Sequence, residues 1–556
     1  METDIQIGRK TKLIPITEIA ERLHIPEDFV LPYGHYKAKI SLRFFEKIKN
    51  NSDGKLILIS AITPTAYGEG KTTVAIGLSM ALNRLGKSSI VTLREPSLGP
   101  VFGIKGGATG GGYSQVLPME DINLHFTGDI PAVSAAHNLL SAALDNHIHF
   151  GNQLRIDERE IIFPRTIDMN DRALRNIVVG LGGKPNGPAR EDRFIITAAS
   201  EVMAILGLVT SLSELKNRLC QILVAFDMNG NPVYAEQLGV CGAMTALLKD
   251  AIKPNLVQTI EHTPAFIHTG PFANIAHGTN SLIATKMALK LCEYVVTEAG
   301  FGTDLGAEKF FDIVCRIGEF KVNAAVVVAT IRAMKLHGGA PEKDLKSGTI
   351  EHLKKGLSNL EKHIENIKIF NVPVVVGLNL FADDTAQEIK LVKSLCEEKN
   401  VLCVEVRAFD KGSEGAIALA QAIIKITEAN QELSKPIYEL QDSIEEKIEK
   451  IALNIYGAER VVYTPKAEKD IIRLKHLGFD KLPVCIAKTH RSLSDDSQIY
   501  GKPEKFKLTI IEVKVSAGAG FLVPLAGEIM LMPGLAKIPN ATKINIDENG
   551  NITGLA

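Results

Sequence analysis

The stretch Ile-Leu-Ile-Ser-Ala-Ile-Thr-Pro-Thr-Ala-Tyr-Gly-Glu-Gly-Lys-Thr-Thr-Val-Ala, residues 57–75, decides the fold. The apolar, β-branched run at residues 56–62 is typical of a buried strand, and it stops at Pro64. Apolar residues then recur with helical spacing at Val74, Leu78 and Leu82. The predicted order is therefore strand, loop, helix.

The loop of this unit carries the residues of a phosphate-binding site. Gly68 and Gly70 allow the backbone to approach a ligand closely, and the N–H groups that open the helix attract an anion. Lys71 is placed to meet the outer phosphates of a nucleotide, and Thr72 to meet a magnesium ion. The P-loop pattern has glycine where this chain has Thr65, and a lone Gly-Lys-Thr often marks only the start of a helix. The strand before the loop and the helix after it nevertheless favour phosphate binding.

Length, composition and charge exclude several classes of protein. A chain of 556 residues is too long for one hydrophobic core, so several domains are expected. The formal net charge of -1 argues against general nucleic-acid binding. The N-terminus shows no secretory signal, and the most apolar segment, residues 194–212, contains Glu201 and favours a buried helix over a membrane span. The 7 scattered cysteines, without a Cys-x-x-Cys pair, predict a reduced cytoplasmic protein with no zinc site.

Buried runs that alternate with helical segments predict an α/β protein with a doubly wound parallel sheet of the P-loop NTPase type. The runs begin near residues 56, 90, 294, 322, 372 and 401. Between residues 155 and 262 the alternation stops, and a helix at 171–180 and a hairpin at 222–234 indicate an inserted α+β module. The expected domains are a nucleotide-binding domain at 1–154 and 263–434, the insert at 155–262, and a mixed C-terminal domain at 435–556.

Charged residues follow two of these runs at the edge where ligands bind in open α/β sheets. Arg94 and Glu95 end the run near residue 90, so they share an edge with the phosphate loop. Such a pair is also common as a purely structural ion pair. The run at residues 294–298 ends in Glu298, where P-loop enzymes place a residue that senses magnesium or water.

Two aromatic residues and a glycine-rich loop complete the predicted site. Phe381 and Phe409 follow two neighbouring runs, and although aromatic residues usually belong to the core, two at one rim can sandwich a flat heterocycle. Residues 103–113 contain six glycines, which favours a ligand-binding loop over a flexible linker. His125 and Asp129 stand four residues apart and fit either a hydrogen-bonded pair or a catalytic one.

Several long motifs resemble those of the formate–tetrahydrofolate ligase family, also called 10-formyltetrahydrofolate synthetase. They occupy residues 63–73, 94–100, 103–113, 120–129, 271–278 and 328–339. The resemblance implies that ATP, formate and tetrahydrofolate give ADP, phosphate and 10-formyltetrahydrofolate through formyl phosphate. It also implies Mg²⁺, a monovalent cation, and a cytoplasmic homotetramer whose partners are small molecules, neither nucleic acid nor membrane.

Position by position, the resemblance implies roles for individual residues. The catalytic residues it implies are Lys71, Arg94 and His125. Those for folate binding are Glu95, Phe381 and Phe409. Those for ATP binding are Thr65, Ala66, Tyr67, Gly68, Glu69, Gly70, Lys71, Thr72 and Thr73, with Thr72 also at the Mg²⁺ ion. Members of the family often carry tryptophan at the position of Phe409, and phenylalanine keeps a stacking face but loses the indole N–H.

Two other classes of function remain open on the sequence. A P-loop switch or scaffold ATPase would use the same nucleotide loop to control a partner protein, but it needs neither Arg94 beside the terminal phosphate nor an aromatic slot. An inactive, purely structural member of the family would be expected to carry damage at Lys71 or Arg94, and both residues are present.

Overall fold

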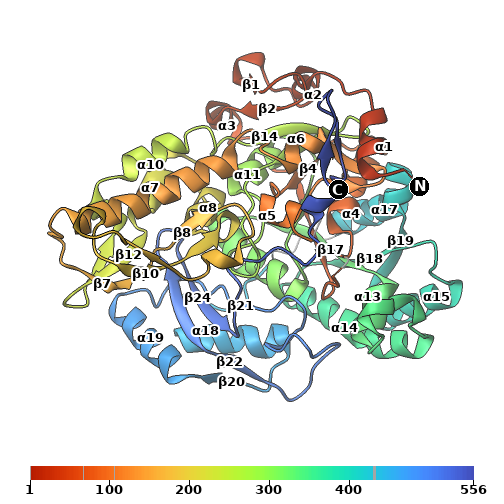
Figure 1. Ribbon diagram of the computed structural model, residues 1–556. Coiled ribbons are helices and arrows are strands. Elements are labelled where there is room, and N and C mark those ends of the chain that lie inside the picture. The colour runs from red at the N-terminus through yellow and green to blue at the C-terminus, as the bar shows by residue number, and fades with distance from the viewer. Residues whose placement is uncertain (1, 67, 105–106, 430–433, 556) are drawn as a thin grey trace.

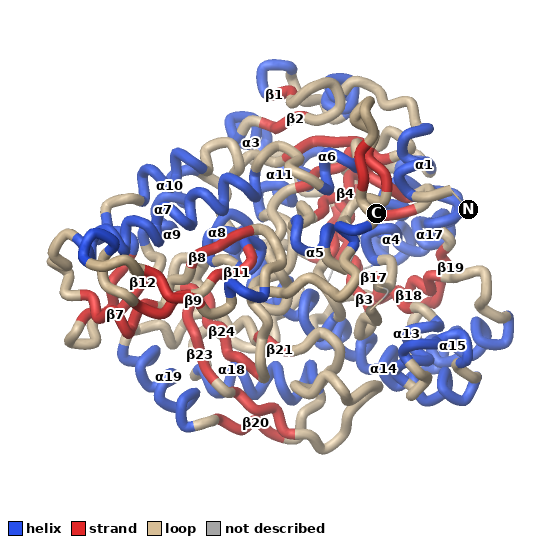
Figure 2. The backbone as a smooth tube through the Cα atoms, in the orientation of Figure 1, coloured by secondary structure: helices blue, strands red, loops and turns tan. Residues whose placement is uncertain are grey.

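One mixed sheet forms the centre of the molecule (Figures 1 and 2). The computed structural model describes residues 2–66, 68–104, 107–429 and 434–555, and this part of the chain contains a sheet of 12 strands. Each predicted buried run lies in its parallel block, so the prediction of an α/β protein is confirmed. In spatial order the parallel strands are β15 (Pro264–Ile267), β4 (Ser89–Leu93), β16 (Tyr294–Glu298), β3 (Lys55–Ala61), β17 (Val322–Ala329), β18 (Val374–Asn379) and β19 (Leu402–Val406).

An antiparallel group extends the sheet beyond β15, and the sequence pattern did not reveal it. Its strands are β1 (Val30–Pro32), β2 (Ala38–Ile40), β5 (Gly110–Gly111), β6 (Ser114–Leu117) and β14 (Asn255–Thr259). The main sheet therefore takes β14 from within residues 155–262, the segment predicted as an insert. The division into three domains stays a prediction.

Helices cover both faces of the parallel block because its strands are apolar on both sides. Along β3, Leu56 and Leu58 belong to one hydrophobic cluster, and Ile57 and Ile59 belong to another. The first cluster includes residues of α11 (Leu282–Leu291), α13 (Ile331–His337) and α14 (Ile350–Ile369). The second includes residues of α4 (Lys71–Arg84) and α17 (Ile417–Ala429). Successive strand residues point to opposite faces, so β3 is enclosed between two helical layers.

The remaining helices of this region lie around the sheet and at its ends. They are α1 (Asp4–Lys10), α2 (Ile16–Arg22), α3 (Leu42–Ile48), α5 (Leu98–Phe102), α6 (Met119–Asn123), α7 (Asp129–His149), α12 (Cys315–Gly318), α15 (Ala386–Glu398) and α16 (Ala408–Lys411). The two chain ends meet beside α1, where Arg9 Nη2 donates to the carbonyl of Ile552 at 2.6 Å (Figure 1).

Residues 150–250 form a mixed region of short strands and helices. The hairpin predicted at residues 222–234 is confirmed as β12 (Leu223–Asp227) and β13 (Pro232–Tyr234). The helix predicted at residues 171–180 is wrong, because Ile177–Val179 forms β9 and pairs with β10 (Arg190–Asp192). The other elements are β7 (Ile156–Ile161), β8 (Arg165–Ile167), β11 (Phe194–Ile196), α8 (Glu201–Gly207), α9 (Leu212–Cys220) and α10 (Cys241–Leu247). Among the described residues, none of the helices has the length and hydropathy needed to span a membrane.

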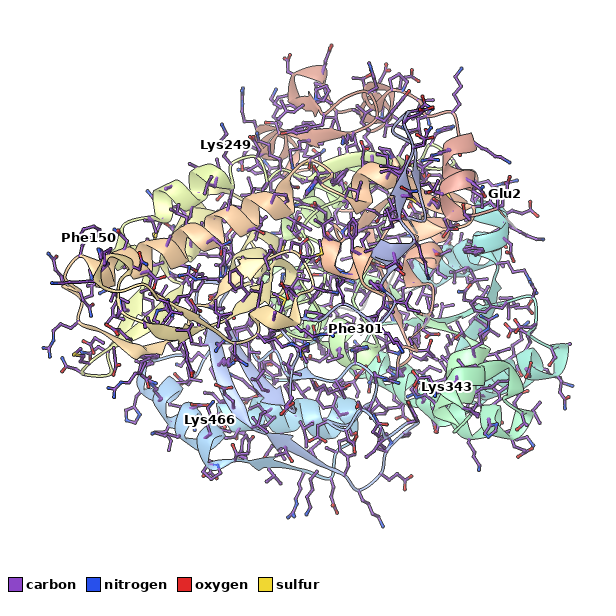
Figure 3. The ribbon with its side chains drawn as sticks, viewed as in Figure 1. Glu2, Phe150, Lys249, Phe301, Lys343 and Lys466 are labelled. Carbon is purple, nitrogen blue, oxygen red and sulfur yellow. The ribbon has the colours of Figure 1, made fainter. Side chains whose placement is uncertain are left out.

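The C-terminal segment packs against the main sheet through buried polar contacts. Its elements are α18 (Ile444–Ile451), β20 (Arg460–Tyr463), α19 (Pro465–His476), β21 (Ala487–Lys488), β22 (Lys507–Ile510), β23 (Glu512–Ser516), β24 (Phe521–Ala526), β25 (Asn545–Ile546) and β26 (Ile552–Thr553). Lys488 Nζ lies 2.7 Å from Asp304 Oδ2, and both side chains are buried. Phe301, labelled near the centre of Figure 3, stacks on His490 with ring centroids 4.5 Å apart.

Two buried histidines hold Thr63, at the base of the loop between β3 and α4. His363 Nε2 accepts from the Thr63 N–H at 2.8 Å, and His337 Nε2 lies 2.8 Å from the Thr63 carbonyl. His337 Nδ1 accepts from the N–H of Gly501 at 3.2 Å, so Nε2 carries the proton and donates to Thr63. Burial lowers the pKa of His337 to about 4. The ring is therefore neutral at pH 7, and the C-terminal segment contributes to the support of the loop.

The low pKa of His337 predicts a pH-dependent contribution to stability. Between pH 6.5 and 4 the unfolded chain binds a proton at this position and the folded chain does not, so wild-type stability falls as the pH falls. His337→Gln keeps an N–H donor and removes the titration. The free energy of unfolding of the wild type relative to this variant should fall by about 3 kcal/mol over that range. Urea unfolding at four pH values measures the difference, and a constant difference would contradict the assignment.

Candidate active site

The loop between β3 and α4 opens the helix toward the carboxyl edge of the sheet. Gly68 and Gly70 have φ angles of 76° and 75°, in the left-handed region that favours glycine. A Cβ on Gly70 would also lie 2.6 Å from Asn379 Nδ2, so the position is restricted twice. The helix begins at Lys71, and its N-cap residue, Gly70, has no side chain that could cap the first turn. Its N-terminal N–H groups and dipole form a site for an anion.

Thr72 connects this helix to the end of a neighbouring strand. Its hydroxyl donates to Glu298 Oε2 at 2.8 Å, and Glu298 is the buried last residue of β16. Because β16 runs parallel to β3 and pairs with it, the two carboxyl ends meet at one edge. The pair offers hydroxyl and carboxylate oxygens, the ligands that Mg²⁺ prefers.

Arg94 lies on the same edge, directly after β4, the next strand beyond β16. Its Nη1 donates to the carbonyl of Pro271 at 3.2 Å, and its buried Nε has no partner among the described residues. Burial lowers the pKa of the guanidinium, and the nearby carboxylate of Glu298 opposes that shift. A partly buried cation with a buried Nε donor is suited to bind a small anion.

Glycine at position 300 makes room for this arginine. A Cβ there would lie 3.1 and 3.2 Å from the two terminal nitrogens of Arg94 and 2.6 Å from the Cβ of Ala273. Lys71, Thr72, Glu298 and Arg94 thus belong to the ends of three adjacent strands, β3, β16 and β4. Two strand spacings separate β3 from β4, roughly 10 Å.

Glu95 directly follows Arg94, and its surroundings connect it to Asp129 and Asp168. The buried carboxyl group of Glu95 has its pKa raised well above its usual range by burial and by Asp129, with Lys39 opposing. Asp129 accepts from Lys39 at 2.7 Å and from Asn255 at 2.8 Å, so it has partners other than His125. His125 is exposed. Burial raises the pKa of the nearby Asp168, and its hydrogen bonds from Ser97 and from the N–H of Leu98 oppose that shift.

The two aromatic residues lie beyond the opposite half of the sheet. Phe381 follows β18 and Phe409 follows β19, which are adjacent strands. β4 and β18 are four strand spacings apart, roughly 20 Å, so Glu95 is not placed beside these rings. Phe409 is 41% exposed, and its ring lies against the backbone of the glycine-rich segment. An added Cβ on Gly111 would meet its ring at 2.9 Å, and the N–H of Tyr113 donates to its carbonyl at 2.8 Å.

The loop residues predicted for ATP fall into different positions. Ala66 and Gly68 are exposed, whereas Thr65, Glu69 and Thr73 are buried. Tyr67 lies outside the described residues. Thr330, Arg332 and Asn379 pack around this loop and Phe381. Thr330 and Arg332 lie within the motif at residues 328–339, but no role was predicted for any of the three, since each contact joins residues far apart in the sequence.

Gly300→Ala should disturb the site through contact with Arg94. Overpacking of this kind costs about 1–3 kcal/mol of unfolding free energy, and displacement of the guanidinium should also lower turnover. Gly242→Ala is the matched control, because nothing lies within 4 Å of a Cβ added in α10. Urea unfolding and steady-state kinetics test both variants. Equal behaviour of the two would show that the close approach at position 300 is unimportant.

Comparison with known proteins identifies the family of this chain. A family model described as formate–tetrahydrofolate ligase matches residues 2–556. Two relatives with that name, from Thermosipho africanus and Thermosipho melanesiensis, are 60% and 59% identical over 556 residues, and the alignments cover 100% of this chain and of each relative. The chain therefore belongs to the formate–tetrahydrofolate ligase family.

Proposed function

We propose that the protein joins formate to tetrahydrofolate at the expense of ATP, giving 10-formyltetrahydrofolate, ADP and phosphate. The observation that carries this proposal is the convergence of α4, Glu298 and Arg94 at one edge of the sheet. That edge offers a helix end suited to an anion and a separate, partly buried cation, on strands about 10 Å apart. Family membership supports the same reaction.

The phosphoryl half of the reaction needs positioning and charge stabilisation more than covalent chemistry. Lys71 and the N–H groups of α4 hold the outer phosphates of ATP, and Arg94 holds formate and the transferred phosphoryl group. A formate oxygen attacks the γ-phosphorus, ADP leaves, and formyl phosphate results. Holding both reactants at one edge replaces a bimolecular encounter by an intramolecular one, for effective molarities of roughly 10⁵–10⁸ M.

The oxygens of Thr72 and Glu298 fit a magnesium ion bound to the phosphates of ATP. Such an ion neutralises charge on the phosphoryl oxygens when it is bound. The monovalent cation of the family is expected here as well.

The folate half of the reaction uses the aromatic residues. Phe381 and Phe409 stack on the pterin, and the N10 amine attacks the formyl carbon to release phosphate. The contact of Gly111 and Gly112 with Phe409 supports this role. We propose that this part of the glycine-rich segment also keeps water from the acyl phosphate. Glu95 and His125 are further candidates for this half of the site.

The finer structural expectations follow from the same resemblance. The parallel block with the loop after β3 is proposed as a P-loop NTPase-like doubly wound domain of residues 1–154 and 263–434. Residues 155–262 and 435–556 are proposed as an inserted and a C-terminal domain. The protein is proposed to act in the cytoplasm as a homotetramer.

The experiment that tests the function measures ADP release with ATP and Mg²⁺ while formate and tetrahydrofolate are each omitted in turn. Sustained release should require both, and 10-formyltetrahydrofolate should form in equal amount. Lys71→Ala and Arg94→Ala should each reduce turnover at least about 10³-fold, since both remove charge from the phosphoryl site. Lys87→Ala is the control, because Lys87 precedes the N-terminal end of β4 whereas Arg94 follows its carboxyl end. ATP hydrolysis that ignores formate would instead favour a switch ATPase.

Phe409→Ala should weaken the binding of tetrahydrofolate without affecting the binding of ATP. Loss of a stacking ring is worth about 1–3 kcal/mol, so the KM for tetrahydrofolate should rise about 5- to 100-fold. The KM for ATP should stay within twofold of wild type. A change confined to the KM for ATP would contradict the stacking role, whereas Phe409→Trp should lower the KM for tetrahydrofolate.

A further inference from the structure

The carboxylate of Glu69 points into the protein instead of toward the phosphate site. The side chain is 2% exposed, and Oε1 accepts from the N–H of Thr65 at 2.8 Å. Oε2 accepts from the hydroxyl of Thr330. The carbonyl of Glu69 accepts from Asn379 Nδ2 at 3.2 Å. The phosphate loop is therefore bonded to the ends of both β17 and β18.

The same two strand ends lead to Phe381. Thr330 is the N-cap of α13, accepting from the N–H of Ala333 at 3.2 Å, and Arg332 lies in the first turn of that helix. The guanidinium of Arg332 lies over the ring of Phe381, 3.9 Å from its centroid. Phe381 follows Asn379 by two residues. A closed ring of contacts thus passes through Glu69, Thr330, Arg332, Phe381 and Asn379.

This closed set of contacts, the loop–aromatic ring, leaves little room for movement of its members. Glu69, Thr330 and Asn379 are all at most 5% exposed, so a broken hydrogen bond would leave a buried polar group unpaired. A Cβ added to Gly70 would lie 2.6 Å from Asn379 Nδ2, which shows how closely the loop already approaches β18. Movement of the loop onto a bound phosphate must therefore carry these strand ends and Arg332 with it. Since Arg332 covers one face of Phe381, the face left for a pterin changes its position.

We propose that Glu69 and Thr330 are positioning residues that couple nucleotide binding to folate binding through the loop–aromatic ring. Bound nucleotide fixes the loop, the loop fixes Phe381, and tetrahydrofolate then binds to an ordered platform. The coupling is reciprocal, so folate also strengthens the binding of the nucleotide. This inference rests on the proposed function, because it needs ATP at α4 and a pterin at Phe381.

The test is the dissociation constant of tetrahydrofolate, measured by calorimetry with and without a saturating non-hydrolysable ATP analogue. In wild type the analogue should tighten folate binding at least about fivefold. Thr330→Val removes the hydroxyl at similar volume, and Glu69→Gln removes one acceptor while Thr330 keeps its cap. Each should reduce the factor below about twofold, with folate affinity in the absence of nucleotide changed less than about threefold. Thr330→Ser retains the hydroxyl and should restore the wild-type factor.

The outcomes separate this inference from the proposed function. If the analogue changes the folate dissociation constant of the wild type less than twofold, the inference is overturned. It is also overturned if Thr330→Val and Glu69→Gln both keep the wild-type factor. Neither result would contradict the proposed function. Phe381→Ala is the reference variant and should weaken folate binding with and without the analogue. Unchanged folate binding in Phe381→Ala would overturn the proposed pterin slot, and the inference with it. Thermal melting of each variant checks that a lost factor does not reflect unfolding.

Discussion

Burial of β3 on both faces is the constraint on which the rest of the structure depends. Its apolar residues alternate between two hydrophobic clusters, and parallel strands bond to it on both sides. A strand held in this way cannot shift its register without exposing apolar side chains or losing ladder hydrogen bonds. The loop that follows β3 is therefore fixed where it leaves the strand. Only the residues farther along the loop can adapt to a ligand.

The polar groups at this edge follow from the same arrangement. Parallel neighbours bring Glu298 and Arg94 to the edge that Lys71 opens, and their partial burial makes each charge cost desolvation energy. Fixed donors and acceptors of this kind stabilise transferred charge without reorganising at the moment of reaction. The buried Nε of Arg94, which has no partner among the described residues, fits this description because it offers a fixed donor to an anion.

The sequence could predict what depends on local pattern. The parallel strands, the strand–loop–helix order at residues 57–75 and the hairpin at residues 222–234 each have signals within a few residues, and all are found. The strand β14 and its antiparallel neighbours were missed because short strands are identified by partners far along the chain, such as Lys39 opposite Asn255. Instead of the helix expected at residues 171–180, the structure has a strand in which Val178 pairs with Glu191. This pairing depends on tertiary contacts, which local secondary-structure propensity does not reveal. Glu69 sits in the expected loop, but the direction of its side chain depends on Thr330, 261 residues later.

The contact of His337 with Gly501 has a consequence for synthesis of the chain. Every residue proposed to touch ATP, formate or folate lies before residue 410, yet Thr63 is supported by a histidine whose other nitrogen bonds to a residue near the C-terminus. Asn359 reinforces this link, bonding both the Thr63 hydroxyl and the Gly501 carbonyl. A nascent polypeptide emerging from the ribosome therefore contains all the residues proposed to contact substrates well before the base of this loop is complete. The hydrogen bonds to Gly501 form only when translation is nearly finished.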